Sequence, residues 1–233
     1  MAHLRRWHDR TVGQRIGSMA ILLFLLLINV FVVPFTVAPD SLSARIIRDV
    51  LLSLILLSGA ATAWDHRRQF VAIALVAGLA IVVRWTGLFI SPGKALGLLD
   101  ETTLFSLGIL CVLIGMRVFG NGTVTFDRIL GAIALYILIG VVWAEAYQLV
   151  SISVPGAYAG ITHDGGAPDH SIWVYFSFVT LTTLGYGDIT PVAHSARSLA
   201  ILEALIGQLY PAIVLARLVS LHVANDGSGT KPT

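Results

Sequence analysis

The sequence predicts an all-α membrane protein with six transmembrane helices and one re-entrant segment. Of its 233 residues, 56% are hydrophobic and only 12% are charged, whereas a soluble domain has about 25% charged residues. A helix needs about 20 apolar residues to cross a bilayer core of about 30 Å. Six stretches meet that need: residues 16–38, 44–64, 70–90, 96–116, 126–150 and 197–221.

The first of these stretches is predicted to remain as a membrane span. Four arginines precede it, as they would precede a cleaved signal peptide, but the apolar run is longer than the roughly 7–15 residues of such a segment. The formal charge of +2 gives no sign of a nucleic-acid partner, and the single cysteine, Cys111, excludes an internal disulfide.

Basic residues in the flanks predict the orientation. With the N-terminus in the cytoplasm, ten Lys and Arg residues fall on the cytoplasmic side and four on the outer side, while Arg84 lies inside the third stretch. Because cytoplasmic loops are enriched in Lys and Arg, we expect a multi-pass protein of the plasma or inner cell membrane with both termini in the cytoplasm. Residues 151–196 then face outward.

Within that outer segment, residues 172–184 form an apolar run that is too short to span. Irregular backbone at membrane depth is tolerated only where protein or a water-filled cavity shields it. A short helix over about residues 171–182, capped by Asp169 or Ser171, followed by a returning loop, fits this run.

The returning loop has the pattern that a backbone cation site requires. Its residues are Thr182, Thr183, Leu184, Gly185, Tyr186, Gly187 and Asp188. Successive carbonyls line one side of a chain only if alternate residues adopt positive φ, which glycine does at little cost. Gly185 and Gly187 alternate with Leu184 and Tyr186, and Thr183 adds a hydroxyl oxygen. Such carbonyl rings replace the hydration shell of an ion.

The run from Trp173 to Asp188 closely resembles the potassium channel family, and the resemblance extends over about residues 126–221. It implies an outer helix, a pore helix, a selectivity filter and an inner helix, with K⁺ bound by the carbonyls of Thr183, Leu184, Gly185 and Tyr186 and by a threonine hydroxyl. It also implies a homotetramer in membrane lipid, because the family surrounds one pore with four filter strands. No cofactor and no enzymatic activity are expected.

The same resemblance assigns supporting roles. Tyr175 stands where the family often has a tryptophan that bonds the filter aspartate, which predicts a Tyr175–Asp188 hydrogen bond. Glu145 matches a glutamate that bonds backbone at the top of the pore. Gly207 lies at the family's glycine hinge, and Pro211, which lacks the N–H that would bond Gly207, predicts a bend there. A static packing kink with a small residue for close helix approach is the alternative.

More than one role is open for the other ionisable groups. Glu203 is expected to be protonated or bonded to threonine hydroxyls near the base of the filter, and Arg84 to pair with Asp100 or Glu101. His163 and His170 lie in an outer loop that two aspartates share. That loop is read as solvated, with zinc binding or proton sensing as the minor alternative.

The domain division follows from these assignments. We expect a cytoplasmic N-terminus (1–15), a four-helix transmembrane domain (16–120), a pore domain (121–222) and a flexible tail (223–233). The four-helix domain lacks the arginine ladder of voltage-gated relatives, because residues 96–116 contain no Lys or Arg. Two alternatives to a potassium-selective channel stay open: a subunit of a potassium transporter, and a non-conducting membrane scaffold.

Overall fold

The computed structural model describes residues 18–36, 42–62, 75, 77–83, 85, 92–120, 125–161 and 169–227, and most of them are helical. Helical residues 18–27 continue into a π-helix, η1 (Ile28–Val32), and then into α2 (Val33–Thr36). The remaining elements are α3 (Leu42–Thr62), α5 (Pro92–Val118), α6 (Phe126–Ser153), β1 (Tyr158–Ala159), α7 (His170–Leu181), β2 (Thr190–Pro191) and α8 (His194–Gly227).

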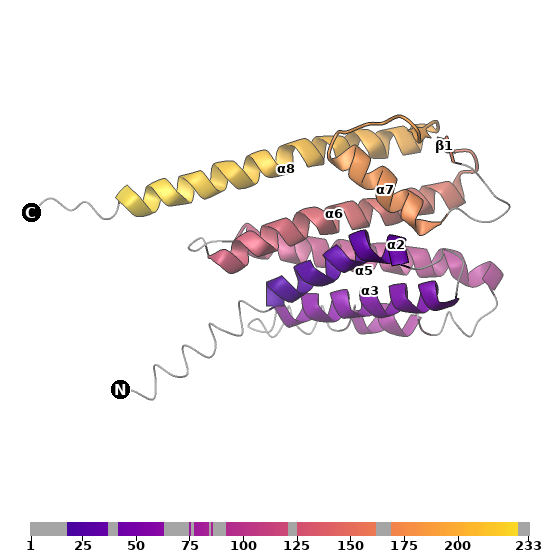
Figure 1. The fold of residues 1–233 in the computed structure, drawn as a ribbon, viewed down its shortest axis with the longest axis horizontal. Coiled ribbons are helices and arrows are strands. Elements are labelled where there is room, and N and C mark those ends of the chain that lie inside the picture. The colour runs from indigo at the N-terminus through magenta and orange to yellow at the C-terminus, as the bar shows by residue number, and fades with distance from the viewer. Residues whose placement is uncertain are drawn as a thin grey trace, which may run out of the picture.

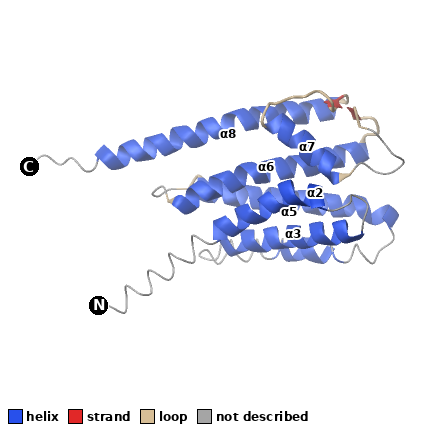
Figure 2. Ribbon diagram, in the orientation of Figure 1, coloured by secondary structure: helices blue, strands red, loops and turns tan. Residues whose placement is uncertain are grey.

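Helix α6 is the central element of this arrangement. It packs against α5 on one side and against α7 and α8 on the other, so the N-terminal helices and the C-terminal helices are separated by it (Figure 1). The two short strands pair antiparallel, with Tyr158 opposite Pro191 and Ala159 opposite Thr190. Figure 2 shows them at the end of the molecule where α8 begins.

Local sequence signals account for where the long helices begin and end. Thr125 is the N-cap of α6, its side chain accepts from the Arg128 amide, and Asp127 lies in the first turn, where a negative charge is favourable. Helix α5 begins at Pro92, since proline suits the first helical position, and it has Arg117 in its last turn.

Three described segments are long and apolar enough to cross a membrane: Glu101–Val118, Phe126–Ser153 and His194–Arg217. They coincide with the fourth, fifth and sixth stretches expected from the sequence. Ser18–Val32 is a shorter apolar helix, and most of the third stretch lies outside the described residues. A helical membrane protein is therefore supported, and the number of six spans stays a prediction.

Two glycines allow the helices around α7 to approach closely. A Cβ at Gly140 of α6 would lie 2.8 Å from the ring of Phe178, and a Cβ at Gly207 of α8 would lie 1.9 Å from the carbonyl oxygen of Leu181. The second contact involves backbone, which cannot move aside as the end of a side chain can. Gly207 is thus required for the packing of α8 on the C-terminal end of α7.

We predict that Gly207→Ala lowers the stability of the folded protein by roughly 1–3 kcal/mol, the usual cost of an overpacked interface. Thermal unfolding in detergent would measure it. Gly108→Ala is the matched control, because no atom lies within 4 Å of a Cβ there. Equal unfolding temperatures for the two variants would contradict the packing role of Gly207.

Candidate functional site

Helix α7 ends where Leu181 approaches Gly207 of α8, and the loop of residues 182–188 follows it directly. The helix has 12 residues, so it is about 18 Å long and too short to cross a bilayer. After its C-cap, Thr182, the chain reverses. The amide of Thr183 then donates to the carbonyl of Thr180 over 2.9 Å, and the amide of Leu184 donates to that of Val179, also over 2.9 Å.

The backbone of this loop alternates as the sequence predicts. Gly185 and Gly187 have φ values of 61° and 80°, so the prediction of left-handed conformations at both glycines is confirmed. Thr183 has a φ of 57° as well, which the sequence did not predict, because a β-branched residue rarely adopts this conformation. Every second residue from Thr183 to Gly187 therefore has positive φ.

The amides of residues 182–185 donate to carbonyls at the end of α7, whereas the carbonyls of the loop have no such partner. In the part of the chain that the structure describes, no hydrogen bond is accepted by a backbone carbonyl of residues 182–187. The side chains are also open to the surroundings of the single chain: Leu184 is 56% exposed and Tyr186 is 68% exposed. The loop thus offers a run of carbonyl oxygens that accept no hydrogen bond within the described residues.

The end of the loop at Asp188 is joined to α7 by a side-chain hydrogen bond. The hydroxyl of Tyr175 donates to the Asp188 carboxylate over 2.7 Å, which confirms the expected bond, and the rings of Tyr175 and Tyr186 are stacked with centroids 6.5 Å apart. The bond stabilises the ionised carboxylate, so it lowers the pKa of Asp188 below its usual range.

Behind the loop, Glu203 of α8 is completely buried in a hydrogen-bonded cluster. Its carboxylate accepts from the hydroxyl of Ser177 on α7 over 2.5 Å and from the hydroxyl of Tyr147 on α6. Ser177 lies 2.7 Å from the carbonyl of Gly140 as well. The expectation that threonine hydroxyls would bond Glu203 was wrong. The orientation of α7 about its axis places Ser177 toward α8. The cluster joins three helices.

One further contact links the loop to α8. The side-chain amide of Gln208 donates to the hydroxyl of Thr183 over 2.9 Å. Sequence analysis missed Gln208, Ser177 and Tyr147. Their signal was a polar side chain inside an apolar stretch, which by itself does not show the direction in which the side chain points.

Glu145 is buried beside the first turn of α7. Its carboxylate lies 3.7 Å from Nε2 of His170, whose Nδ1 lies 2.7 Å from the Gln148 side-chain oxygen. The expected bond from Glu145 to backbone stays a prediction. At the same turn, Asp169 is the N-cap residue of α7, but its side chain makes no capping bond and instead accepts from the hydroxyl of Ser171.

Helix α8 is continuous through Gly207 and Pro211. The close approach of Gly207 to Leu181 supports the packing alternative for that residue, whereas its role as a gating hinge stays a prediction. Arg84, expected to pair with Asp100 or Glu101, and His163 lie outside the described residues.

The comparisons with known proteins agree with this geometry. Residues 151–223 match the family model described as an ion channel. The chain is similar to two pore potassium channel c of Oryza sativa subsp. japonica, 36% identical over 77 residues, which are 32% of this chain and 17% of the rice protein. It is also similar to Protein LctB of Bacillus caldotenax, 27% identical over 116 residues, which are 48% of this chain and 86% of that protein.

A second Protein LctB, from Geobacillus stearothermophilus, is 48% identical over 46 residues, which are 20% of this chain and 34% of that protein. No solved structure matches the chain. The chain thus spans less than a fifth of the length of the rice channel. The resemblance to potassium channels is confirmed for the part of the chain that the ion channel model covers.

We predict that Tyr175→Phe raises the pKa of Asp188 toward the ordinary value of about 3.9. The tyrosine bond lowers that pKa, so its contribution to stability is present at neutral pH and is lost as the pH falls through the lowered pKa. NMR titration of the Asp188 carboxyl carbon measures the shift. Tyr158→Phe is the control, because the Tyr158 hydroxyl makes no hydrogen bond within the described residues. An unchanged titration in Tyr175→Phe would contradict this assignment.

Proposed function

We propose that this chain, whose residues 151–223 carry an ion channel domain, is a subunit of a potassium-selective channel. The observation that carries the proposal is the alternating backbone of the loop after α7, with positive φ at Thr183, Gly185 and Gly187. The amides of residues 182–185 donate to α7, and the described residues offer no hydrogen-bond donor to the carbonyls of residues 182–187.

A row of carbonyls has a clear chemical use. Rings of carbonyl oxygens from several chains can replace the hydration shell of K⁺, as the TVGYG loops of potassium channels do. We assign the filter to Thr182, Thr183, Leu184, Gly185, Tyr186 and Gly187. The C-terminal end of α7 adds a partial negative charge at the inner end of the filter, which favours a cation there.

Four copies of the chain are proposed to surround one pore. Much of α8 lacks a partner within a single chain, since only 11% of its membrane-spanning window is buried, compared with 56% for α6. Its exposed apolar residues include Ile201, Leu205, Leu209 and Ile213, each more than half exposed. Neighbouring subunits and lipid would cover this face, and one filter strand per chain requires several chains to enclose an ion.

The rest of the topology is part of the same proposal. Six spans with cytoplasmic termini would divide the chain into an N-terminus (1–15), a four-helix domain (16–120), a pore domain (121–222) and a tail (223–233). Asp188, Tyr175 and Glu145 would support the filter from its outer end. Gly207 and Pro211 would be the site of bending, and transport would be passive, without a cofactor or catalysis.

We predict that Gly185→Ala and Gly187→Ala each abolish potassium-selective flux while the protein still inserts and assembles. Alanine resists positive φ, so the carbonyls on either side of the substituted position would turn out of line. The measurement is K⁺ flux into liposomes that contain the purified protein, with Na⁺ as the competing ion.

Leu184→Val is the matched control within the filter. Only the carbonyl of residue 184 would face the ion, so selectivity should survive the change of side chain. Selective flux in both glycine variants would refute the filter assignment. Wild-type protein without any flux would favour the scaffold alternative, and flux that requires a second ion gradient would favour the transporter alternative.

We expect native mass spectrometry of the wild-type chain in mild detergent to give a tetramer. The physical reason is that the apolar face of α8 and the carbonyl row both need partners that a single chain does not supply. Leu205→Glu should weaken the assembly, because it places a charge on that face. A strictly monomeric or dimeric wild type would count against the proposed pore.

A further inference from the structure

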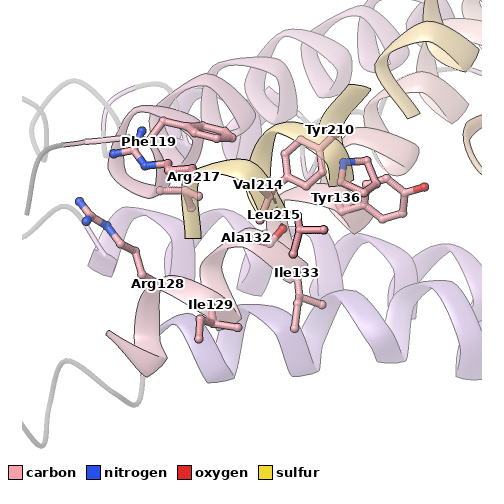
Figure 3. Close-up of a pocket in the computed structure, with 12 residues that line it drawn as sticks. Phe119, Arg128, Ile129, Ala132, Ile133, Tyr136, Tyr210, Val214, Leu215 and Arg217 are labelled. Carbon is pink, nitrogen blue, oxygen red and sulfur yellow. Dashed lines mark hydrogen bonds between the residues drawn. The ribbon is translucent and has the colours of Figure 1, made fainter. Parts of the chain in front are cut away.

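Beside the part of α8 from Tyr210 to Arg217, the structure contains an apolar cavity of about 330 Å³ between α6 and α8. Its size is within the range of small-molecule sites, roughly 300–1,000 Å³. The wall is formed by Ile129 and Ile133 of α6 and by Pro211, Val214 and Leu215 of α8. Figure 3 shows Tyr136 and Tyr210 at one end of the cavity and Arg128 and Arg217 at the other.

The polar end of the cavity is held together by one carbonyl group. Arg128 donates to the carbonyl of Gly120 over 2.7 Å, and Arg217 donates to the same oxygen over 2.5 Å. The Arg217 guanidinium also lies 5.6 Å from the centre of the Phe119 ring. Two cations from different helices are thus fixed at the mouth of one apolar cavity.

Positive charge is in excess at this mouth. Arg117 adds a third guanidinium, and both it and Arg217 are near enough to repel Arg128. The acid that the structure places in this group is Asp127, whose carboxylate lies 4.0 Å from Arg117. A guanidinium has five N–H donors in a fork that suits phosphate oxygens, and the shared Gly120 carbonyl occupies only one donor of Arg217. A phosphate group fits this charge and geometry.

The arginines lie where the membrane surface is expected. The segment His194–Arg217 has 24 residues, which is about 36 Å of helix, slightly more than the bilayer core of about 30 Å. If the filter end of α8 is at one membrane surface, Arg217 is at the other. Arg117 is near the C-terminal end of the span Glu101–Val118, and Arg128 is near the N-terminal end of the span Phe126–Ser153, so both lie where α5 is followed by α6. Basic pockets between helices at the cytoplasmic surface suit anionic lipid headgroups.

We propose that this cavity binds an anionic phospholipid of the inner leaflet. One acyl chain occupies the apolar part between α6 and α8, and the phosphate lies between Arg128 and Arg217. The site is separate from the filter and does not depend on the ion that the filter conducts. Its lipid would contact the segment of α8 that begins at Tyr210, which follows the close approach of Gly207 to Leu181 of α7.

The test is native mass spectrometry of the assembled protein with added phosphatidylglycerol or phosphatidylcholine. We expect wild type to retain phosphatidylglycerol preferentially. Arg217→Gln should lower that retention about fivefold, since one basic side chain at an anionic surface contributes on the order of 1 kcal/mol, and Arg128→Gln with Arg217→Gln should lower it further. Excess inorganic phosphate should not displace the lipid, because it cannot fill the apolar part of the cavity.

Arg197→Gln is the matched control. Arg197 is on the same helix, is exposed, and donates to the Pro191 carbonyl over 3.2 Å at the opposite end. Its substitution should leave retention unchanged. An equal loss in Arg197→Gln, or full retention in the double variant, would overturn the proposal, as would displacement by phosphate alone.

A variant with a filled cavity tests whether a lipid or a second copy of the chain occupies the cavity. Ile133→Trp should weaken retention of phosphatidylglycerol while the mass of the assembly stays the same. Loss of the assembly with unchanged lipid retention would show that a neighbouring chain fills the cavity, and the proposal would fail. Thermal unfolding of each variant confirms that the fold is intact.

Discussion

The unpaired carbonyls of residues 182–187 are the constraint on which the rest of the molecule depends. Backbone polar groups removed from water need partners, and in a bilayer only protein or a water-filled path can supply them. The amides of residues 182–185 donate to the carbonyls of Phe178, Val179 and Thr180 in α7. Within the described residues, the carbonyls of residues 182–187 accept no hydrogen bond. A cation on the axis of an assembly is the partner that the proposed function provides.

The loop is held in place by contacts with several elements of the structure. Tyr175 holds one end of the loop through its hydrogen bond to Asp188, and Gln208 holds the other end through its hydrogen bond to Thr183. The β1–β2 ribbon joins the segment after the loop to the segment after α6. A hydrogen bond contributes about 1 kcal/mol net, and a residue such as Thr183 with φ of 57° costs on the order of 1–3 kcal/mol. Several bonds are needed to offset one strained residue.

The loop and its glycines were predictable from sequence because their conformation is determined locally. The alternation of glycine with other residues along the loop indicates which residues adopt positive φ. The Tyr175–Asp188 bond was predictable from a resemblance, since that position commonly carries a donor. The partners of Glu203 were not, because they depend on the rotation of α6 and α7 about their axes, which apolar composition leaves undetermined. For the same reason Gln208 was missed. The sequence singled out Gly207 as a hinge or packing residue, but its contact with the Leu181 carbonyl depends on how α7 and α8 pack.

These contacts divide α8 into two parts with different attachments. Up to Gln208, the helix is fixed to α7 by the buried Glu203 cluster and the close approach of Gly207 to Leu181. Beyond that point its described polar contacts go to the α5–α6 region, through Tyr210 to the Ala132 carbonyl and Arg217 to the Gly120 carbonyl. Pro211 lies at the start of this second part and cannot donate a backbone hydrogen bond. A bend at this point would move the second part of α8 against α6, while the part beside the proposed filter stays held by α7. The proposed bend at Pro211 and the proposed lipid cavity therefore concern the same part of the helix, whereas Gly207 and the contacts with the proposed filter belong to the other part.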